Sequence, residues 1–345
     1  MASGQRDLSF GGSDGFAVAF EGSGLIGQSA MAVDSMGRVL VVQASSSYES
    51  EGMVVARLDT EGRLDSSFGT GGKVSFACVC VYEFPNLMID GQGRIVVMSP
   101  GNEMIPRVGS YPPEFEFGPY SISLFRLLPS GARDTSFGNG GSTSIKGFDT
   151  RSGALRKNGS IVMTAFRRGK GSFVVRVSAN GRAVDRQFNA SKRLRGRKLG
   201  GVLALPKNRV AILGSQEGGS QSILLRLGGD GSLDSSFRGD GIAKLSFSVS
   251  TFDADRRGRI LISGTTAERG LGGPAEGWGV LRRLLPNGKR DMRFLNGLGD
   301  RDVSSELSVQ AFYNGDRPMV FQDSTFVDEC RAYCRPDPTL SRFLG

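Results

Sequence analysis

Short apolar runs recur along the chain, and each is bounded by glycine or by polar turn residues. One kind follows a turn and occurs at 37–42 (GRVLVV), 93–98 (GRIVVM), 159–164 (GSIVMT), 208–213 (NRVAIL), 258–263 (GRILIS) and 316–321 (DRPMVF). A second kind ends in an arginine and occurs at 53–57, 122–126, 173–176, 223–226 and 279–283. Such short, continuous, β-branched runs are typical of strands buried on both faces. A third short run follows a glycine turn, as at 71–77, so we expect units of three or four antiparallel strands and no helix.

The same units carry a repeated Asp-x-x-Phe pattern. It occurs at Asp7–Phe10, Asp65–Phe68, Asp134–Phe137, Asp185–Phe188, Asp234–Phe237 and Asp291–Phe294, and a degraded copy ends at Phe343. The phenylalanines are spaced by 58, 69, 51, 49, 57 and 49 residues, and the first five intervals average about 57. An arginine precedes the phenylalanine by eleven residues in four copies (Arg57, Arg126, Arg226 and Arg283) and by twelve at Arg176. One such sheet cannot bury both of its faces, but stacked copies can.

This period predicts an all-β fold of the propeller type, because kelch-type blades run about 50 residues. Counting from Phe10 to Phe343 gives six intervals. We therefore expect one six-bladed β-propeller domain over residues 1–345, with units ending near Phe68, Phe137, Phe188, Phe237, Phe294 and Phe343. The N- and C-terminal segments would together complete one blade and close the ring. A solenoid of stacked units is the competing geometry, and the lack of evident capping segments with polar outer faces favours the ring.

The repeated units resemble a known bacterial repeat. Residues 230–241 read DGSLDSSFRGDG, and the stretch from 39 to 74 shows the same order of apolar strand, arginine-ended strand and Asp-x-x-Phe turn. The pattern is similar to the delta-60 repeat of large bacterial proteins, and the resemblance covers nearly the whole chain. It is weaker at Phe188, where the glycine-rich turn is replaced, and weakest after Ser304. The resemblance implies a propeller-type β protein of a group that is commonly exported and mostly without assigned activity.

The recurring residues have a structural interpretation. We expect each aspartate to accept backbone N–H bonds in the following turn and each phenylalanine to fill the gap between neighbouring sheets. These residues are Asp65, Phe68, Asp134, Phe137, Asp185, Phe188, Asp234, Phe237, Asp291 and Phe294. A calcium site at a turn such as 230–234 is the alternative, but one turn offers two carboxylates where calcium needs six or more oxygens. The repeated arginines predict ion pairs such as Arg57 with Asp65, and a ring of cations around a channel is the other hypothesis.

Charge is the main asymmetry of the chain. The formal net charge is +9, yet the segment from Lys146 to Lys198 contains fifteen Lys or Arg and two acids, so it alone carries +13. The densest basic run is Lys192, Arg193, Arg195, Arg197 and Lys198. A patch of this kind favours a polyanion. Stacking aromatics are missing apart from Phe188, so we expect an acidic polysaccharide or a cell-surface protein rather than nucleic acid. A solvated loop is the structural alternative.

Composition restricts the chemistry. The chain has no histidine, which excludes histidine triads, imidazole bases and histidine metal ligands. The repeat already accounts for every candidate aspartate, so we expect no catalytic residue, no cofactor and no metal. A non-catalytic binding module is the favoured function. A carboxylate-based hydrolase or lyase with its site in the central channel is the alternative, and a structural segment of a cell-surface array is a third possibility.

Four cysteines bear on the compartment. Cys78 and Cys80 would lie on one face of a strand, whereas a short loop could join Cys330 and Cys334 in a disulfide. A zinc site is a weaker alternative, because the pairs lack the usual ligand spacing. No run approaches the ~20 apolar residues that cross a bilayer, and the first residues lack a signal-peptide core. Either the protein is cytoplasmic or a leader is missing, and we expect a secreted or cell-surface protein whose leader is not present in this sequence.

Overall fold

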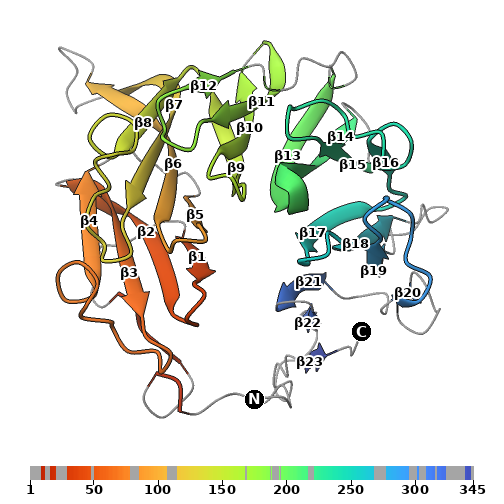
Figure 1. Ribbon diagram of the computed structural model, residues 1–345, viewed down its shortest axis with the longest axis horizontal. Helices are drawn as coiled ribbons and strands as arrows, with labels where there is room; N and C mark the ends of the chain where they lie inside the picture. Colours follow the sequence, from red (N-terminus) through yellow and green to blue (C-terminus); the bar gives the residue numbers. More distant parts are fainter. Residues whose placement is uncertain are drawn as a thin grey trace. The chain divides into compact units, whose positions relative to one another are not determined.

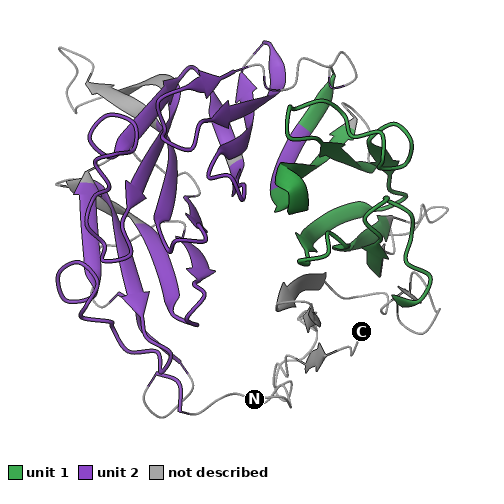
Figure 2. Ribbon diagram, in the orientation of Figure 1, with its two compact units in different colours: residues 1–5, 196–198, 203–345 green, residues 6–195, 199–202 purple. Residues whose placement is uncertain are grey.

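A computed structural model gives the structure of the chain (Figure 1). It describes residues 9–11, 16–20, 29–47, 50–77, 85–106, 115–167, 169–186, 188, 194, 196–216, 221–267, 277–294, 301–302, 308–314, 317–323 and 339–342. The chain divides into two compact units (Figure 2). The N-terminal compact unit comprises residues 6–195 and 199–202, and the C-terminal compact unit comprises residues 1–5, 196–198 and 203–345.

The described strands form antiparallel sheets, which are numbered here in chain order. Sheets 1 to 3 lie in the N-terminal compact unit. Sheet 1 consists of β1 (Ser29–Val33), β2 (Val39–Ser47), β3 (Ser50–Leu58) and β4 (Lys73–Ala77). Sheet 2 consists of β5 (Asn86–Ile89), β6 (Ile95–Pro106), β7 (Phe115–Leu127) and β8 (Ser142–Lys146). Sheet 3 consists of β9 (Asp149–Leu155), β10 (Ile161–Arg167), β11 (Gly171–Val177) and β12 (Val184–Asp185).

The remaining three sheets continue the same meander. Sheet 4 consists of β13 (Arg197–Leu205), β14 (Arg209–Gln216), β15 (Ser222–Leu227) and β16 (Ile242–Lys244), with the 3-10 turn η2 (Pro206–Asn208) between its first two strands. Sheet 5 consists of β17 (Ser248–Ala254), β18 (Ile260–Ala267), β19 (Gly277–Leu284) and β20 (Arg301–Asp302). Sheet 6 consists of β21 (Ser308–Asn314), β22 (Arg317–Asp323) and β23 (Thr339–Arg342). The prediction of short antiparallel strands in every unit is confirmed.

Each sheet places an arginine of its third strand at the same register. The backbone partners are Leu40 with Arg57, Val96 with Arg126, Val162 with Arg176, Ala211 with Arg226, Leu261 with Arg283 and Met319 with Arg342. Arg342 therefore occupies the position of the repeated arginine. Phe343 follows it directly, whereas the other phenylalanines of the repeat follow their arginine by eleven or twelve residues. The register thus differs from the expectation that Phe343 ends a seventh copy of the turn.

The cores lie between sheets 1 and 2, between sheets 2 and 3, and between sheets 4 and 5. Leu87 of β5 packs with Val42 and Phe68 of sheet 1, and Met98 of β6 packs with Phe137 and Met163 of β10. In the C-terminal compact unit Phe237 packs with residues of β14, β15, β18 and β19. The apolar runs of sheet 2 are buried on both faces because sheets 1 and 3 cover it. Each phenylalanine precedes the fourth strand in sheets 1, 2 and 4, so a sheet extends beyond the residue that divides the units in the sequence.

No helix in the described part of the chain has the length and apolar character needed to span a bilayer.

Candidate functional site

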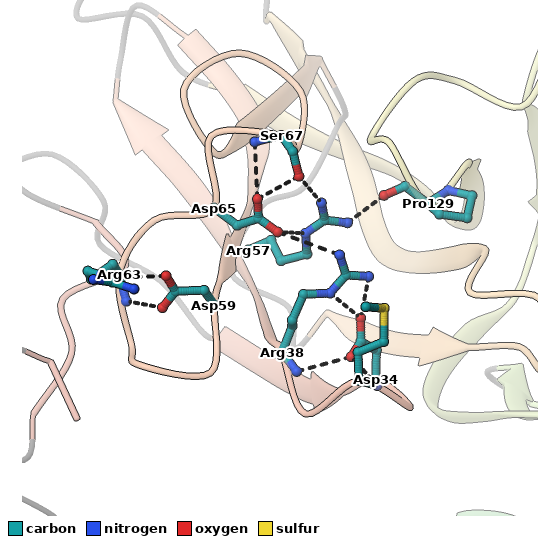
Figure 3. Close-up of polar contacts among 9 residues, drawn as sticks. Asp34, Arg38, Arg57, Asp59, Arg63, Asp65, Ser67 and Pro129 are labelled. Carbon is teal, nitrogen blue, oxygen red and sulfur yellow. Dashed lines mark hydrogen bonds and ion pairs between the residues drawn. The ribbon is translucent and has the colours of Figure 1, made fainter. Parts of the chain in front are cut away.

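The Asp-x-x-Phe turn forms a corner with the arginine that is the last residue but one of the third strand, Arg57 in sheet 1 (Figure 3). In sheet 1, Arg57 Nε donates to Asp65 Oδ2 at 2.8 Å, and Arg57 Nη2 donates to Ser67 Oγ at 3.0 Å. Asp65 Oδ1 accepts the Ser67 N–H at 3.1 Å and the Ser67 hydroxyl at 2.6 Å. The carboxylate therefore closes its own turn with one oxygen and holds the arginine with the other.

The corner also joins its sheet to the next one. Arg57 Nη1 donates to the carbonyl of Pro129, and the Arg57 guanidinium lies 4.6 Å from the centre of the Phe68 ring. A β-carbon added at Gly131 would come within 3.0 Å of Phe68. Gly131 also has a positive φ of 88°, so glycine is required there both for the turn and for the ring. The phenylalanine of one sheet thus packs against the turn of the following sheet.

The same arrangement recurs in other sheets. Arg126 Nε lies 2.7 Å from Asp134 Oδ2, Arg226 Nε lies 2.9 Å from Asp234 Oδ2, and Arg283 Nε lies 2.8 Å from Asp291 Oδ2. The three guanidiniums stack on Phe137, Phe237 and Phe294 at 4.6, 4.7 and 4.4 Å. All four arginines with this corner are buried. These cations pair within their own corners, which is the ion-pair interpretation of the repeated arginines.

The carboxylates of the corners are held ionised. The Ser67 hydroxyl, together with the charge and hydrogen bond of Arg57, keeps the pKa of Asp65 below its usual value. Burial raises the pKa of Asp134 and Asp234, but hydrogen bonds from Ser136 and Ser236 and the positive charge of the arginines outweigh burial and lower it. A general acid needs the opposite shift. These aspartates are therefore suited to binding arginine and not to donating a proton.

A second ion pair closes the turn before the second strand. Arg38 lies 2.7 Å from Asp34 Oδ2, Arg94 Nε lies 2.6 Å from Asp90 Oδ2, and Arg259 pairs in the same way with Asp255. Arg38 Nη1 also lies 3.6 Å from Asp65 Oδ2, so the turn pair adjoins the corner (Figure 3). In sheet 4 the turn aspartate is replaced by Leu205, and Arg209 instead lies 2.9 Å from Asp234.

Sheet 3 departs from this scheme. The turn that reads Asp-x-x-Gly-Arg in sheets 1, 2 and 5 reads Arg156-Lys-Asn-Gly-Ser160 here. Arg156 is 2% exposed, and its Nε donates to Ser160 Oγ at 2.8 Å. The corner is also one residue longer, and Arg176 Nη2 lies 3.1 Å from an Asp185 side chain that is 38% exposed, compared with 7% for Asp134. A cavity of about 270 Å³ opens beside these residues.

The two arginines of sheet 3 share one aromatic ring. Phe188 is buried, and the guanidiniums of Arg156 and Arg176 lie 5.1 and 4.7 Å from its ring centre. Burial, followed by the nearby charge of Arg176, lowers the pKa of Arg156. The sequence analysis did not single out Arg156. The sequence feature that could have identified it is an arginine at the repeat position where three other turns have aspartate.

The structure places the other residues of interest as follows. Phe68, Phe137, Phe188, Phe237 and Phe294 are buried. Of the basic run, Arg197 and Lys198 begin β13, and Lys198 is exposed. Lys192, Arg193, Arg195, Phe343, Cys330 and Cys334 lie outside the described residues. In the turn considered for calcium, Asp230 Oδ1 accepts the N–H and the hydroxyl of Ser232. Within the described ranges no three acidic or cysteine side chains gather as metal ligands would.

Comparisons with known proteins agree with this architecture. The model of a β-propeller domain of unknown function, DUF5122, matches residues 208–237, which span β14, β15 and the corner ending at Phe237. Among curated protein sequences, none matches the chain. The family match therefore covers one corner unit.

Several solved structures are similar at low sequence identity. A puromycin-hydrolysing peptidase from Mycobacterium tuberculosis is 11% identical with a TM-score of 0.50, over 86% of this chain and 41% of that one. The β-propeller domain of the Trilobed protease from Pyrococcus furiosus is 9% identical with a TM-score of 0.44, over 75% and 68% of the two chains. Regucalcin from Agrobacterium tumefaciens, a calcium-binding protein, is 11% identical with a TM-score of 0.40, over 88% and 84%. At these identities the likeness concerns the fold alone, and the chain is an all-β protein of the β-propeller repeat type.

Proposed function

We propose that the protein is a non-catalytic, exported six-bladed β-propeller that binds an anionic macromolecule, such as an acidic polysaccharide or an acidic cell-surface protein. The observation that carries the binding role is the charge of the segment from Lys146 to Lys198, with fifteen basic and two acidic residues. A surface of this kind attracts polyanions and speeds their association. Export is proposed from the resemblance to the delta-60 repeat and from the paired cysteines.

The alternative of a carboxylate-based hydrolase has weaker support. In the described corners the carboxylates of Asp65, Asp134 and Asp234 have lowered pKa values. Each also forms an ion pair with a buried arginine. A carboxylate general acid would need a raised pKa and access to substrate. Binding is therefore the function that we retain.

Closure of the ring is proposed from the N-terminal copy of the corner. Gly11 N–H donates to the Glu61 carbonyl at 2.8 Å, as Gly69 N–H donates to Ser130 at 2.8 Å one sheet later. A β-carbon added at Gly62 would come within 3.1 Å of both Phe10 and Ala17. The corresponding neighbours of Gly131 are Phe68 and Val74 of β4. The segment around Phe10 thus packs on sheet 1 as the corner and fourth strand of a preceding sheet would.

Sheet 6 has the strands that the N-terminal corner would complete. In the described residues it contains three strands, and the third carries Arg342 at the register of the repeated arginine. The corner that such an arginine requires is present in the sequence as Gly4-Gln-Arg-Asp7-Leu-Ser-Phe10, which matches Gly62-Arg-Leu-Asp65-Ser-Ser-Phe68. We therefore propose that the N-terminal segment supplies the corner and fourth strand of the sixth blade, with Asp7 pairing Arg342. Phe16 and Val18, 61% and 62% exposed, are the apolar side chains that this blade would cover.

A retention experiment tests the binding role. Replacing Lys192, Arg193, Arg195, Arg197 and Lys198 with glutamine should weaken binding to heparin at least tenfold at low salt and lower the salt concentration of elution. The physical reason is that fewer counterions are released when fewer cations contact the polymer. Affinity would be measured by titration across several salt concentrations, so that the slope is obtained as well.

The matched control removes five exposed charges outside the basic segment. These are Lys207, Arg238, Arg256, Arg257 and Lys289, which are all exposed and give the same change of net charge. The control variant should retain most of the wild-type affinity. Equal losses in the two variants would mean that only net charge matters and would overturn the proposed surface. Full retention after neutralising 192–198 would do the same.

A further inference from the structure

The cavity of sheet 3 has the composition of a small anion site. It is lined by Arg156, Asn158, Ser160, Arg176 and Asp185, together with Ser178, Ala179 and Ala183. Two guanidiniums and one carboxylate give the described part of this lining a formal charge of +1. The described lining residues all belong to the N-terminal compact unit.

Comparison of the turns shows how the extra charge arises. Sheets 1, 2 and 5 each combine two arginines with two aspartates at the turn and the corner, so their charges cancel. Sheet 4 has two arginines and one aspartate, but Arg209 and Arg226 both lie 2.9 Å from Asp234. In sheet 3 the aspartate itself has become the buried Arg156, and Ser160 replaces the turn arginine. A buried cation thus stands where the other turns bury an anion.

The cost of this arrangement points to a ligand. Two cations that share the Phe188 ring repel one another, and the pKa of Arg156 is lowered first by burial and then by Arg176. Asp185, which pairs with Arg176, lies farther out than the aspartates of the other corners. An oxyanion bound in the cavity would offset both the repulsion and the burial cost. Guanidiniums and hydroxyls are the donors that bind carboxylate, sulfate and phosphate groups.

We propose that the cavity beside Arg156 and Arg176 is a binding site for a single oxyanion group of a small ligand or of an acidic sugar residue. Its volume of about 270 Å³ lies just below the range of roughly 300–1,000 Å³ for small-molecule sites. The site therefore fits one small acidic group and not an extended ligand. The Ser160 and Ser178 hydroxyls at its wall already donate to Asn158 Oδ1 and Asn180 Oδ1, both at 2.7 Å, so the guanidiniums are the main donors that a ligand would meet.

Titrations with sodium sulfate, sodium phosphate and sodium acetate test the site. Each would be followed by NMR of the arginine Nε–H groups at constant ionic strength, with chloride as the balancing ion. Saturable shifts of the Arg156 and Arg176 signals are expected with at least one of the three anions. Acetate alone would indicate a carboxylate ligand, whereas sulfate or phosphate alone would indicate an ester group.

Three variants decide where the anion binds. Arg156→Gln should weaken binding at least tenfold, and Lys157→Gln, an exposed neighbour with the same charge change, should leave it within twofold. The double variant Arg156→Asp with Ser160→Arg rebuilds the ion pair of the other turns. It should fold at least as stably as the wild type and lose binding, so a folding defect in Arg156→Gln does not obscure the result.

Two results would overturn the site. One is the absence of any saturable shift in the wild type up to about 50 mM anion, a concentration that would saturate a site with a Kd on the order of 1 mM. The other is equal binding by the double variant and the wild type. If the variant neutralised at 192–198 loses heparin retention but keeps the small-anion shifts, the two proposals are independent. Failure of the heparin test alone leaves the cavity site standing.

Discussion

Replacing Phe137 with alanine is expected to lower the free energy of unfolding of the sheets that it joins by about 3–5 kcal/mol. Phe137 is fully buried and packs with Met98 of β6, Ile161 and Met163 of β10. Its ring also fills the space above Gly181, where an added β-carbon would come within 2.7 Å of it. Truncation leaves a cavity that neither neighbouring sheet can close. Urea unfolding followed by circular dichroism would measure the loss.

The control for this prediction is Phe166→Ala. Phe166 lies near the end of β10, and its side chain is 47% exposed. Replacing it with alanine should therefore lower the free energy of unfolding by less than about 1 kcal/mol. If both variants are destabilised equally, the phenylalanine of the repeat does not pin the sheets together. A Phe137 variant as stable as the wild type would lead to the same conclusion.

Asp134→Asn is expected to cost about 3–5 kcal/mol, because it leaves Arg126 as an uncompensated buried charge. Arg126 and Asp134 are both nearly inaccessible, and they lie 2.7 Å apart. Asparagine can still accept the two bonds from Ser136, so the turn keeps its hydrogen bonds and the change isolates the ion pair. The same urea experiment measures it.

Asp59→Asn provides the matched control. Asp59 also bonds the backbone of its own turn, and it pairs with Arg63 at 3.1 Å, but that arginine side chain is 70% exposed. The exposed pair should contribute no more than about 1 kcal/mol. Comparable losses at Asp134 and Asp59 would show that burial does not decide the strength of these pairs, contrary to the account given for the corner.

Much of the fold could be predicted from the sequence, because the repeated features are local. Apolar runs such as 93–98 become strands because they are short, β-branched and covered on both faces. The corner could be predicted because an aspartate two residues before a serine closes its own turn, as Asp65 does with Ser67. These signals depend on neighbours in the sequence and recur in several units.

Other features depend on register, which spacing alone does not determine. The stretch from Leu340 to Phe343 has the spacing of a degraded turn, yet the backbone pairing of Met319 with Arg342 places Thr339–Arg342 in the third strand of sheet 6. In sheet 3, Val184 pairs with Val177 as Leu64 pairs with Leu58 in the corner of sheet 1, and the pairing extends by one further residue, from Arg176 to Asp185. Pairing between strands decides both cases.

The cavity of sheet 3 was missed for a different reason. The charge of the segment from 146 to 198 drew attention to its densest run at 192–198. Arg156, however, stands out because it replaces the aspartate of the other turns, and not because it lies in a dense run of charges. Aligning the turns of the units residue by residue would have shown an arginine at the position of Asp34, Asp90 and Asp255.

A double-mutant cycle between Asp7 and Arg342 tests ring closure most directly. Asp7→Asn, Arg342→Gln and the double variant would be unfolded in urea, with Arg331→Gln replacing Arg342→Gln in a parallel control cycle. If the two ends share the sixth blade, the double variant should cost less than the sum of the single variants by about 1–3 kcal/mol, and the control cycle should be additive. Additivity of Asp7 and Arg342 within about 0.5 kcal/mol would contradict the closed ring.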